Sequence, residues 1–343
     1  MYLGVIMGAG FASGRECWQF FGVFGRKGAF GAVFTCIVFI LMAWMLTYIA
    51  RSRNTADLGQ LVSPTDNPVV VQGIGYLLAL IYYTLIMSMS AAGGSLLNQE
   101  LGIPKPVGGI IIVALVIMTV FGDFERLSRI FGKIVPIVFA FSIVTILLVI
   151  FSSSIKQSGP VSGYSPSRIA PKWWISGVIF ASYNGLGMIT MAGQCALQAK
   201  DRRTAFRGAV IGAALPGVMT LLLLAALLKD MAFSSAMDLP MLAYSLRISK
   251  VLNIFYAVTL YGSIYSTAAS TFYGFSTKIR PGRRKKSILA AAAVIGYLLG
   301  LTGFKTLVAY LYPAQGYVGI VIIGMIAVNY FKEKRQNSQN RQI

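Results

Sequence analysis

The 343-residue sequence contains no histidine. Histidine is the commonest metal ligand and the side chain best suited to carry protons near neutral pH, so its absence argues against a histidine-based metal centre or proton relay. Cysteine is also scarce, and Cys17, Cys36 and Cys195 all lie in apolar segments. Their spacing matches neither a disulfide framework nor a set of metal ligands. We interpret them as small buried side chains.

Charged residues are few as well. They make up 12% of the chain, against 56% for hydrophobic residues, a balance typical of a multi-pass membrane protein. The net charge of +20 comes from lysines and arginines in short loops between apolar runs. This distribution indicates membrane topology rather than nucleic-acid binding. We expect a lipid bilayer and a small-molecule solute as partners, and no nucleic acid.

The sequence also lacks the groups that membrane enzymes and pumps use. No Gly-x-x-x-x-Gly-Lys-Ser/Thr stretch is present, which argues against ATP-driven transport by this chain. The apolar segments contain no pair of carboxylates for acid–base or metal chemistry. We therefore predict that the protein is not an enzyme and needs no cofactor, apart from a sodium ion if transport is sodium-coupled.

Apolar runs predict an all-α integral membrane protein with about ten spans, because roughly 20 apolar residues cross the hydrocarbon core. The predicted spans are 1–22, 28–50, 68–97, 107–121, 131–151, 172–197, 205–228, 249–277, 287–302 and 305–331. Matching hydropathy and an odd number of spans in each half indicate a five-plus-five inverted repeat. The predicted parts are a first repeat (1–151), an extracytoplasmic linker (152–171), a second repeat (172–331) and a cytoplasmic tail (332–343). The excess of lysine and arginine in the loops on the side of the termini predicts that both termini are cytoplasmic.

The first span is interrupted by a glycine-rich stretch at 8–16, Gly-Ala-Gly-Phe-Ala-Ser-Gly-Arg-Glu. Glycine disfavours a continuous helix by about 1 kcal/mol relative to alanine, and irregular backbone at membrane depth is tolerated only where it is buried or lines a cavity. We therefore predict a broken helix. Gly8, Ala9 and Gly10 would let a ligand approach the backbone, and the positive end of the following half-helix suits a carboxylate. Ser13 either adds a hydroxyl to this site or bonds to its own helix.

A second interruption is predicted at the corresponding place in the sixth span, where residues 182–187 read Ser-Tyr-Asn-Gly-Leu-Gly. Interrupted segments in matching positions of two halves point to a substrate site at the midplane. We expect Asn184 and Gly185 at this site. Glycines that only allow close helix packing are the alternative. Phe11 and other aromatic side chains either line the pocket or pack ordinarily.

The eighth span carries a row of hydroxyls, Ser266, Thr267, Ser270 and Thr271. Residues three and four apart share a helix face, so one pair of these hydroxyls is predicted to help bind a cation such as sodium. Hydroxyls that bond back to their own helix are an equally strong interpretation.

Arg15 and Glu16 form the one adjacent charge pair inside a predicted span. Ionisable groups at membrane depth are costly to bury and are therefore candidates for function. We predict either a gating or structural ion pair, or a proton carrier at Glu16.

The stretch at 8–16, in a chain of this length and span number, resembles an uncharacterised bacterial membrane-protein family that is similar to a distant branch of the amino acid–polyamine–organocation superfamily. The resemblance covers essentially the whole chain and implies the inverted-repeat fold of the bacterial leucine transporter, in the cytoplasmic (inner) membrane. It also implies that backbone amides at Gly8, Ala9 and Gly10 bind a substrate carboxylate. In ion-coupled members a sodium site uses carbonyls that map near Gly4 and Met7, together with a hydroxyl pair of the eighth span. The Arg15–Glu16 pair is not general in the superfamily, so the resemblance implies no role for it.

These features predict a secondary transporter, a permease that moves a small amino-acid-like solute by alternating access in symport with sodium or protons. The alternative is a ligand-sensing membrane protein that uses the same midplane pocket without net transport.

Overall fold

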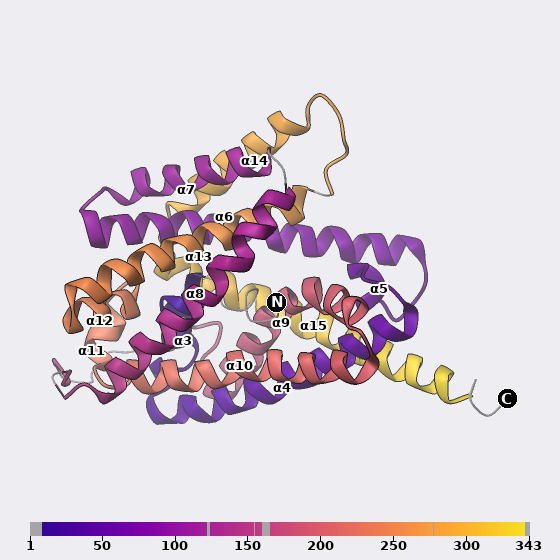
Figure 1. Ribbon diagram of the computed structural model, residues 1–343, viewed down its shortest axis with the longest axis horizontal. Coiled ribbons are helices and arrows are strands. Elements are labelled where there is room, and N and C mark those ends of the chain that lie inside the picture. The colour runs from indigo at the N-terminus through magenta and orange to yellow at the C-terminus, as the bar shows by residue number, and fades with distance from the viewer. Residues whose placement is uncertain (1–8, 122–123, 154, 160–164, 277, 340–343) are drawn as a thin grey trace.

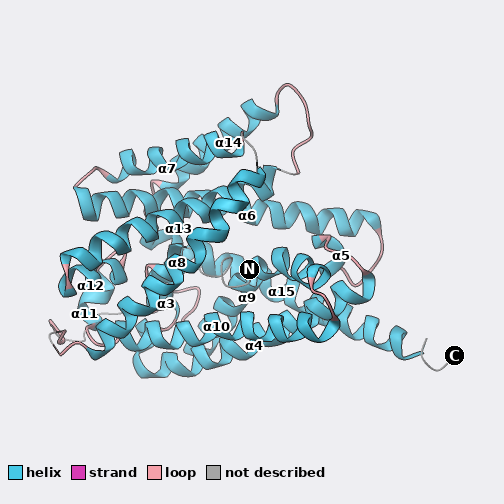
Figure 2. Ribbon diagram, in the orientation of Figure 1, coloured by secondary structure: helices cyan, strands magenta, loops and turns pink. Residues whose placement is uncertain are grey.

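The computed structural model describes residues 9–121, 124–153, 155–159, 165–276 and 278–339, with only the backbone described at 9, 124–136, 138, 190 and 191. Within these residues the chain forms helices joined by turns and loops (Figures 1 and 2). The elements are α2 (Ala9–Ala12), α3 (Arg15–Phe20), the short 3-10 helix η1 (Gly22–Lys27), α4 (Gly28–Arg53), α5 (Leu58–Val62), α6 (Pro68–Leu101), α7 (Lys105–Val120), α8 (Phe124–Phe151), α9 (Trp173–Gln198), α10 (Arg202–Leu227), α11 (Met231–Ala236), α12 (Pro240–Ile248), α13 (Lys250–Ser276), α14 (Lys285–Gly300) and α15 (Phe304–Gln339).

Each predicted span overlaps a helix, and the described part of the first span corresponds to the pair α2 and α3. Helix α8 begins earlier and α15 ends later than predicted, because polar residues extend each helix beyond its apolar run. Among the described residues, four helices are individually long and apolar enough to cross a membrane, and the bent helix α9 makes a fifth. The protein is therefore a multi-pass membrane protein. The opposite orientation of the two halves, the boundaries of the repeats and the sides of the termini remain predictions. The short helices α5, α11 and α12 lie in connecting segments where no helix was predicted.

Helix α4 shows how the sequence separates a lipid face from a packed face. Its small residues Gly31 and Ala32 are buried, whereas large apolar residues on another face are exposed. These exposed residues are Phe30, Val33, Ile37, Leu41 and Trp44. They recur every three or four positions, so they form one stripe along the helix. An exposed apolar stripe of this length is suited to lipid and not to water.

The long helices form two groups (Figure 1). Helices α4, α9, α10 and α15 pack against one another, and α6, α7, α13 and α14 form a second packed set. Helix α8 contacts both sets through α10 and α13. The two pieces of the first span divide between the sets, because α2 contacts α6 and α13 whereas α3 contacts α9, α10 and α15. The interruption of the first span therefore lies where the chain passes from one helix group to the other.

Close helix packing in the first group depends on glycine. A β-carbon on Gly316 of α15 would lie 2.6 Å from the carbonyl oxygen of Ile179 in α9, and one on Gly319 would lie 2.7 Å from the carbonyl oxygen of Ser182. Small residues at such contacts let two backbones approach closely, which is how helices associate within a membrane.

We expect the variant Gly316→Val to destabilise the protein by about 1–3 kcal/mol, because the added side chain meets backbone of α9 that has no room to yield. The loss appears as a lower midpoint of thermal unfolding of the purified protein. Gly324→Val is the matched control on the same helix, since nothing lies within 4 Å of a β-carbon at Gly324. Equal midpoints for the two variants would contradict the packing described for α9 and α15.

Candidate functional site

The predicted interruption of the first span is present, and it lies at Ser13 and Gly14. Helix α2 ends at Ala12 and α3 begins at Arg15. Gly14 has a φ of 80°, in the left-handed region that glycine adopts without strain, and its amide donates to the carbonyl of Phe11 over 3.0 Å. A β-carbon at Gly14 would also lie 2.8 Å from Cγ of Met241. The chain needs glycine here for both reasons.

The backbone carbonyls freed by this break are bound by the protein itself. The hydroxyl of Tyr256 in α13 donates to the carbonyl of Ala12. The amide of Met241 in α12 donates to the carbonyl of Ser13 over 2.9 Å. The Ser13 hydroxyl donates to the carbonyl of Gly10, also over 2.9 Å, so it bonds to its own helix as the alternative interpretation held. In this conformation each of these carbonyls therefore already accepts a hydrogen bond from the protein.

Glu16, in the first turn of α3, is buried. Its side chain is 2% exposed, and the Tyr183 hydroxyl of α9 donates to its Oε1 over 3.4 Å. Its Oε2 is buried without a hydrogen-bond partner. A β-carbon on Gly10 would lie 2.6 Å from Cδ of Glu16, so the carboxylate lies directly against the glycine of α2. The carboxylate of the motif thus folds back onto Gly10.

Through Tyr183, Glu16 is linked to further polar side chains from helices that are distant in sequence. Tyr312 of α15 stacks on Tyr183 with ring centroids 4.5 Å apart, and its hydroxyl is buried without a partner beside Ser88 of α6. The Ser88 hydroxyl is likewise unpartnered. One turn beyond Tyr312, the Gln315 amide nitrogen donates to the Thr84 hydroxyl of α6, whereas its Oε1 has no partner. We call this set, Glu16, Ser88, Tyr183, Tyr312 and Gln315, the central cluster.

The sequence prediction missed Ser88, Tyr312 and Gln315. One local feature marks Tyr312 and Gln315, the polar, proline-containing Tyr-Pro-Ala-Gln at 312–315 in an otherwise apolar span. Pro313 lacks an amide hydrogen and so frees the carbonyl of Ala309, which accepts instead from the Ser167 hydroxyl over 2.7 Å. The carbonyl that Pro313 leaves without its helical partner is thus hydrogen-bonded close to Tyr312 and Gln315, the two cluster residues of α15.

Arg15 points in another direction from Glu16. Its Nη1 donates to the carbonyls of Ser235 and Met237, each over 3.2 Å. These carbonyls belong to α11 and to the turn between α11 and α12, which cover one end of the helix groups (Figure 1). No ion pair joins Arg15 and Glu16 among the described residues. The ion-pair alternative is therefore not seen in this conformation, in which Arg15 and Glu16 have different partners, and the role of the two residues stays a prediction.

Asp238 links α11, α12 and the turn between them to the surrounding helices. Its carboxylate pairs with Lys105 of α7 and accepts from the Ser95 hydroxyl of α6 over 3.1 Å. Lys305 of α15 lies 3.8 Å from the same carboxylate and also donates to the carbonyl of Ala236. We call α11, the turn and α12 the lid, and we call Arg15, Ser95, Lys105, Asp238 and Lys305 the lid network.

Electrostatics hold the lid network in its charged form. Burial alone would raise the pKa of Asp238, but the hydrogen bond and charge of Lys105, together with the charge of Lys305, lower it below its usual value. Asp230, at the start of α11, behaves in the same way, because hydrogen bonds from Arg247 and Phe233 outweigh the effect of burial and lower its pKa. Both carboxylates are therefore ionised at neutral pH, and both ion pairs persist into mildly acidic solution.

The predicted interruption of the sixth span at 182–187 is not found there. Helix α9 continues without interruption through this stretch. The Asn184 side chain donates to the carbonyl of Phe180 over 3.1 Å, and Gly185 packs against Met42. The helix does bend by 47°, between Ile189 and Ala192. Asn184 and Gly185 thus serve helix packing and backbone bonding, and the bend lies one to two turns later.

The hydroxyls of the eighth span bond to their own helix. Ser266 donates to the carbonyl of Ser263 over 3.0 Å, and Ser270 and Thr271 both donate to the carbonyl of Thr267 over 3.1 and 2.7 Å. Ser266 is buried whereas Ser270 is exposed. In this conformation these hydroxyls are occupied as donors, and the sodium site proposed for them stays a prediction.

The remaining predicted residues divide into two sets. Gly4, Met7 and Gly8 lie outside the described residues, and only the backbone of Ala9 is described. Gly10 and Phe11 are buried in α2, with Phe11 fully enclosed in the core. The structure thus brings Gly10 and Glu16 together, as parts of one motif.

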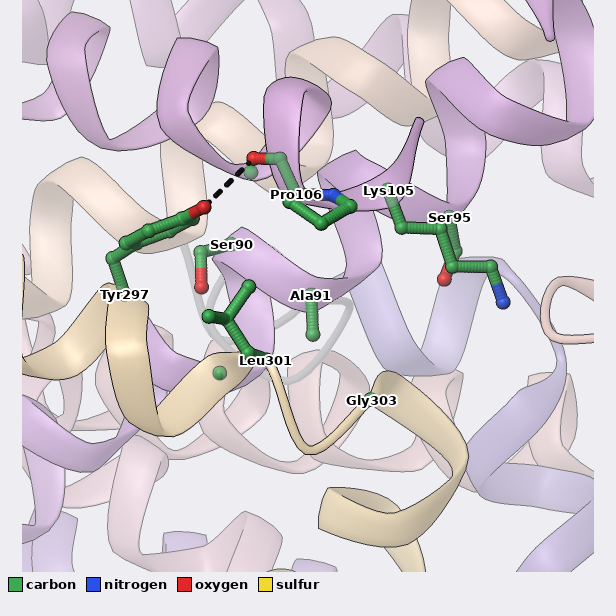
Figure 3. Close-up of a pocket in the computed structure, with 10 residues that line it drawn as sticks. Ser90, Ala91, Ser95, Lys105, Pro106, Tyr297, Leu301 and Gly303 are labelled. Carbon is green, nitrogen blue, oxygen red and sulfur yellow. Dashed lines mark hydrogen bonds between the residues drawn. The ribbon is translucent and has the colours of Figure 1, made fainter. Parts of the chain in front are cut away.

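A small cavity of about 90 Å³ lies between α6, α7 and α14, near the lid network. Figure 3 shows Tyr297 reaching across it toward Pro106, whose carbonyl accepts from the Tyr297 hydroxyl over 3.2 Å. Ser95 and Lys105, two members of the lid network, also line it. The cavity contains no residue of the central cluster, so it is distinct from the site around Glu16.

No family model matches the chain. The uncharacterized membrane protein YkvI of Bacillus subtilis (strain 168) is 24% identical over 342 residues, covering 95% of this chain and 93% of that protein. The uncharacterized protein YyaD of the same organism is 21% identical over 325 residues, covering 94% and 93%. Among solved structures, the manganese transporter of Eremococcus coleocola, in complex with an aromatic bis-isothiourea substituted compound, aligns with a TM-score of 0.54 and 16% identity over 94% of this chain and 76% of its own. A mutant form of that transporter aligns equally well, over 75% of its length. The chain therefore has the helical fold of a membrane transporter and is similar to uncharacterised membrane proteins along nearly all of its length.

Proposed function

We propose that the protein is a secondary transporter that moves a small amino-acid-like solute by alternating access, in symport with sodium or protons. The proposal places it in the cytoplasmic membrane with both termini inside, as a distant branch of the amino acid–polyamine–organocation superfamily. The manganese carried by the structural neighbour makes a metal ion the competing cargo, but among the described residues no cluster of acidic, cysteine or histidine side chains suits a metal ion.

The observation that carries the proposal is the position of the broken first span. Its two pieces contact different helix groups, and the break is the point at which a polar cluster with one carboxylate is enclosed. A ligand that binds at such a junction affects both groups at once, and relative movement of two packed groups is the basis of alternating access.

We expect proteoliposomes that contain the purified protein to accumulate at least one neutral amino acid from a radiolabelled panel. Accumulation should require an imposed sodium or proton gradient and should be absent from empty vesicles. The two gradients are imposed separately, with potassium replacing sodium at equal ionic strength. If accumulation requires sodium, the next variants are paired alanine replacements at Ser266/Thr267 and at Ser270/Thr271.

Binding without accumulation is the outcome that would contradict the proposal. An amino acid that raises the thermal midpoint of the protein but is never accumulated would favour the ligand-sensing alternative, because ligands stabilise any folded state that they bind. Uptake of manganese in place of amino acids would contradict the substrate class and leave the transport mechanism standing.

A further inference from the structure

We propose that Glu16 binds and releases one proton in each transport cycle, and that this proton permits a solute carboxylate to bind beside Gly10. The inference rests on the proposed function and specifies its coupling ion and the recognition of its solute. The structure supports it through the isolation of Glu16, its contact with Gly10 and the separate engagement of Arg15.

Glu16 is a carboxylate without a counter-charge. It is 2% exposed, one oxygen has no partner, and the other has only the 3.4 Å bond from Tyr183. Its neighbour Arg15 is turned away toward the carbonyls of the lid. An unpaired buried charge is strongly disfavoured, and the group becomes neutral unless a cation joins it. A proton achieves this neutrality within the space that the side chain already fills.

The groups that contact Glu16 from the elements packed against α3 are neutral, and Arg26 and Lys27 of the adjoining η1 form no ion pair with it among the described residues. Helix α9 contributes Tyr183, α15 contributes Tyr312, and α2 contributes Gly10. Helix α10 approaches α3 at Cys17, whose thiol donates to the carbonyl of Thr220. Among the described residues no lysine or arginine forms an ion pair with Glu16. The charge of Glu16 is therefore governed by the proton and by whatever ligand approaches.

The contact with Gly10 links this proton to the solute. The backbone near Gly10 is the proposed position of the solute carboxylate, and Cδ of Glu16 lies 2.6 Å from where a Gly10 β-carbon would be. Two carboxylates this close repel each other strongly in a site shielded from water. Protonation of Glu16 removes the repulsion, so proton and solute bind together, and each raises the affinity for the other.

The step balances without a further reactant. A proton from water on the open side forms an O–H bond with a carboxylate oxygen of Glu16, giving the neutral acid and leaving one hydroxide equivalent to the buffer. When the site opens to the other side, that O–H bond breaks, the proton returns to water, and the carboxylate re-forms as the solute leaves. One proton thus accompanies one solute carboxylate in the same direction.

Infrared difference spectroscopy of the full-length protein in proteoliposomes tests the proposal with protons alone as the first probe. We expect a carbonyl band of a protonated carboxylic acid that disappears as the pH is raised, and that is absent from Glu16→Gln. The variant Tyr183→Phe should keep the band but move its frequency, because the Tyr183 hydroxyl bonds to Glu16. Glu333→Gln is the matched control and should leave the band unchanged, because Glu333 is paired with Arg53 over 2.7 Å.

A mixture of the twenty common amino acids is the second probe. At a fixed pH at which the band is partly developed, the mixture should increase it, and solute affinity should rise by up to about tenfold for each unit by which the pH is lowered. Spectra of the parent protein and of Glu16→Gln that titrate identically would overturn the proposal, as would amino-acid uptake that is independent of pH in the parent protein. Absence of uptake together with a titrating Glu16 band would overturn the proposed function instead and leave the proton site in place. If Glu16→Gln does not fold, Tyr183→Phe still tests the proposal. A carbonyl band whose frequency is the same in Tyr183→Phe and in the parent protein would contradict its assignment to Glu16.

Discussion

Replacing Gly10 by valine should reduce solute uptake by roughly tenfold or more while leaving folded protein in the membrane. The added side chain would occupy the space where the Glu16 carboxyl group lies, with Cδ 2.6 Å from the new β-carbon. The end of the Glu16 side chain is flexible, so α2 and α3 can keep their helical conformation. The carboxylate, however, must move away from Tyr183. Overpacking at a buried site costs about 1–3 kcal/mol, and a cost of about 1.4 kcal/mol already changes an equilibrium constant, such as that for solute binding, by about tenfold. The measurement is initial uptake per amount of folded protein, judged by gel filtration and thermal midpoint.

Gly73→Val is the matched control for this experiment. Gly73 lies in α6, and nothing lies within 4 Å of a β-carbon at that position. It should transport like the parent protein. Normal uptake by Gly10→Val would show that the first-span site is not used. If Gly10→Val alone fails to give folded protein, uptake is measured instead with Gly10→Ala, which adds only the β-carbon.

Removing the charge of Asp238 should open the lid more often. The variant Asp238→Asn loses the pair with Lys105 and the attraction of Lys305, both of which hold the lid against the helix groups. Because both lysines are partly exposed, we expect an effect of about 1 kcal/mol, which corresponds to roughly fivefold. The measurement is the labelling rate, by a membrane-impermeant maleimide, of a cysteine introduced at Gln19, a buried residue whose side chain lies 3.5 Å from Arg15 of the lid network. The background variant has its three native cysteines replaced.

The lid should respond to pH in a defined direction. The pKa of Asp238 is lowered in the folded state despite burial, by Lys105 and Lys305. A lowered folded-state pKa means that the stabilisation is present at neutral pH and is lost only as the pH falls through the lowered value. Because maleimide reacts with the thiolate, whose fraction falls with pH, labelling is compared at each pH with that of a fully exposed cysteine. This ratio should rise in strong acid in the parent protein and stay high at every pH in Asp238→Asn. Asp66→Asn is the control, because Asp66 is exposed and pairs with Arg53 away from the lid. Unchanged labelling of Asp238→Asn would contradict the role given to the lid network.

Much of the helical framework could be predicted from the sequence because the membrane imposes it. Crossing the hydrocarbon core needs a long apolar helix, so apolar runs locate the helices, although polar extensions such as those of α8 and α15 are missed. The first break was predictable for a similarly local reason, since a left-handed residue such as Gly14 needs glycine. The short helices α5, α11 and α12 were not predicted, because they lie in the connections and have no span-length apolar run.

The sixth-span break was misplaced because glycine has two uses that look alike in a sequence. Gly185 lies against Met42 and Gly193 against Ala56, so both allow close packing of helices rather than a break. The hydroxyls of α13 posed the same ambiguity, and the structure shows them bonded to their own helix. Which use applies depends on the neighbouring helix, and local sequence does not identify that neighbour.

The central cluster could not be assembled from the sequence for a related reason. Glu16, Ser88, Tyr183 and Tyr312 come from four helices that are separated by about 70 residues or more along the chain. Each is an ordinary polar or aromatic residue in its own segment. Only their meeting at the break of the first span gives them a common role.

Accumulation of a radiolabelled amino acid in proteoliposomes, driven by an imposed proton gradient alone, tests the central claim most directly. We predict that the amino acid rises inside the vesicles above its outside concentration, and that Glu16→Gln exchanges the amino acid across the membrane without accumulating it. A protein that binds amino acids but never concentrates them under either a proton or a sodium gradient would contradict the assignment as a transporter. Accumulation by Glu16→Gln equal to that of the parent protein would contradict the role of Glu16.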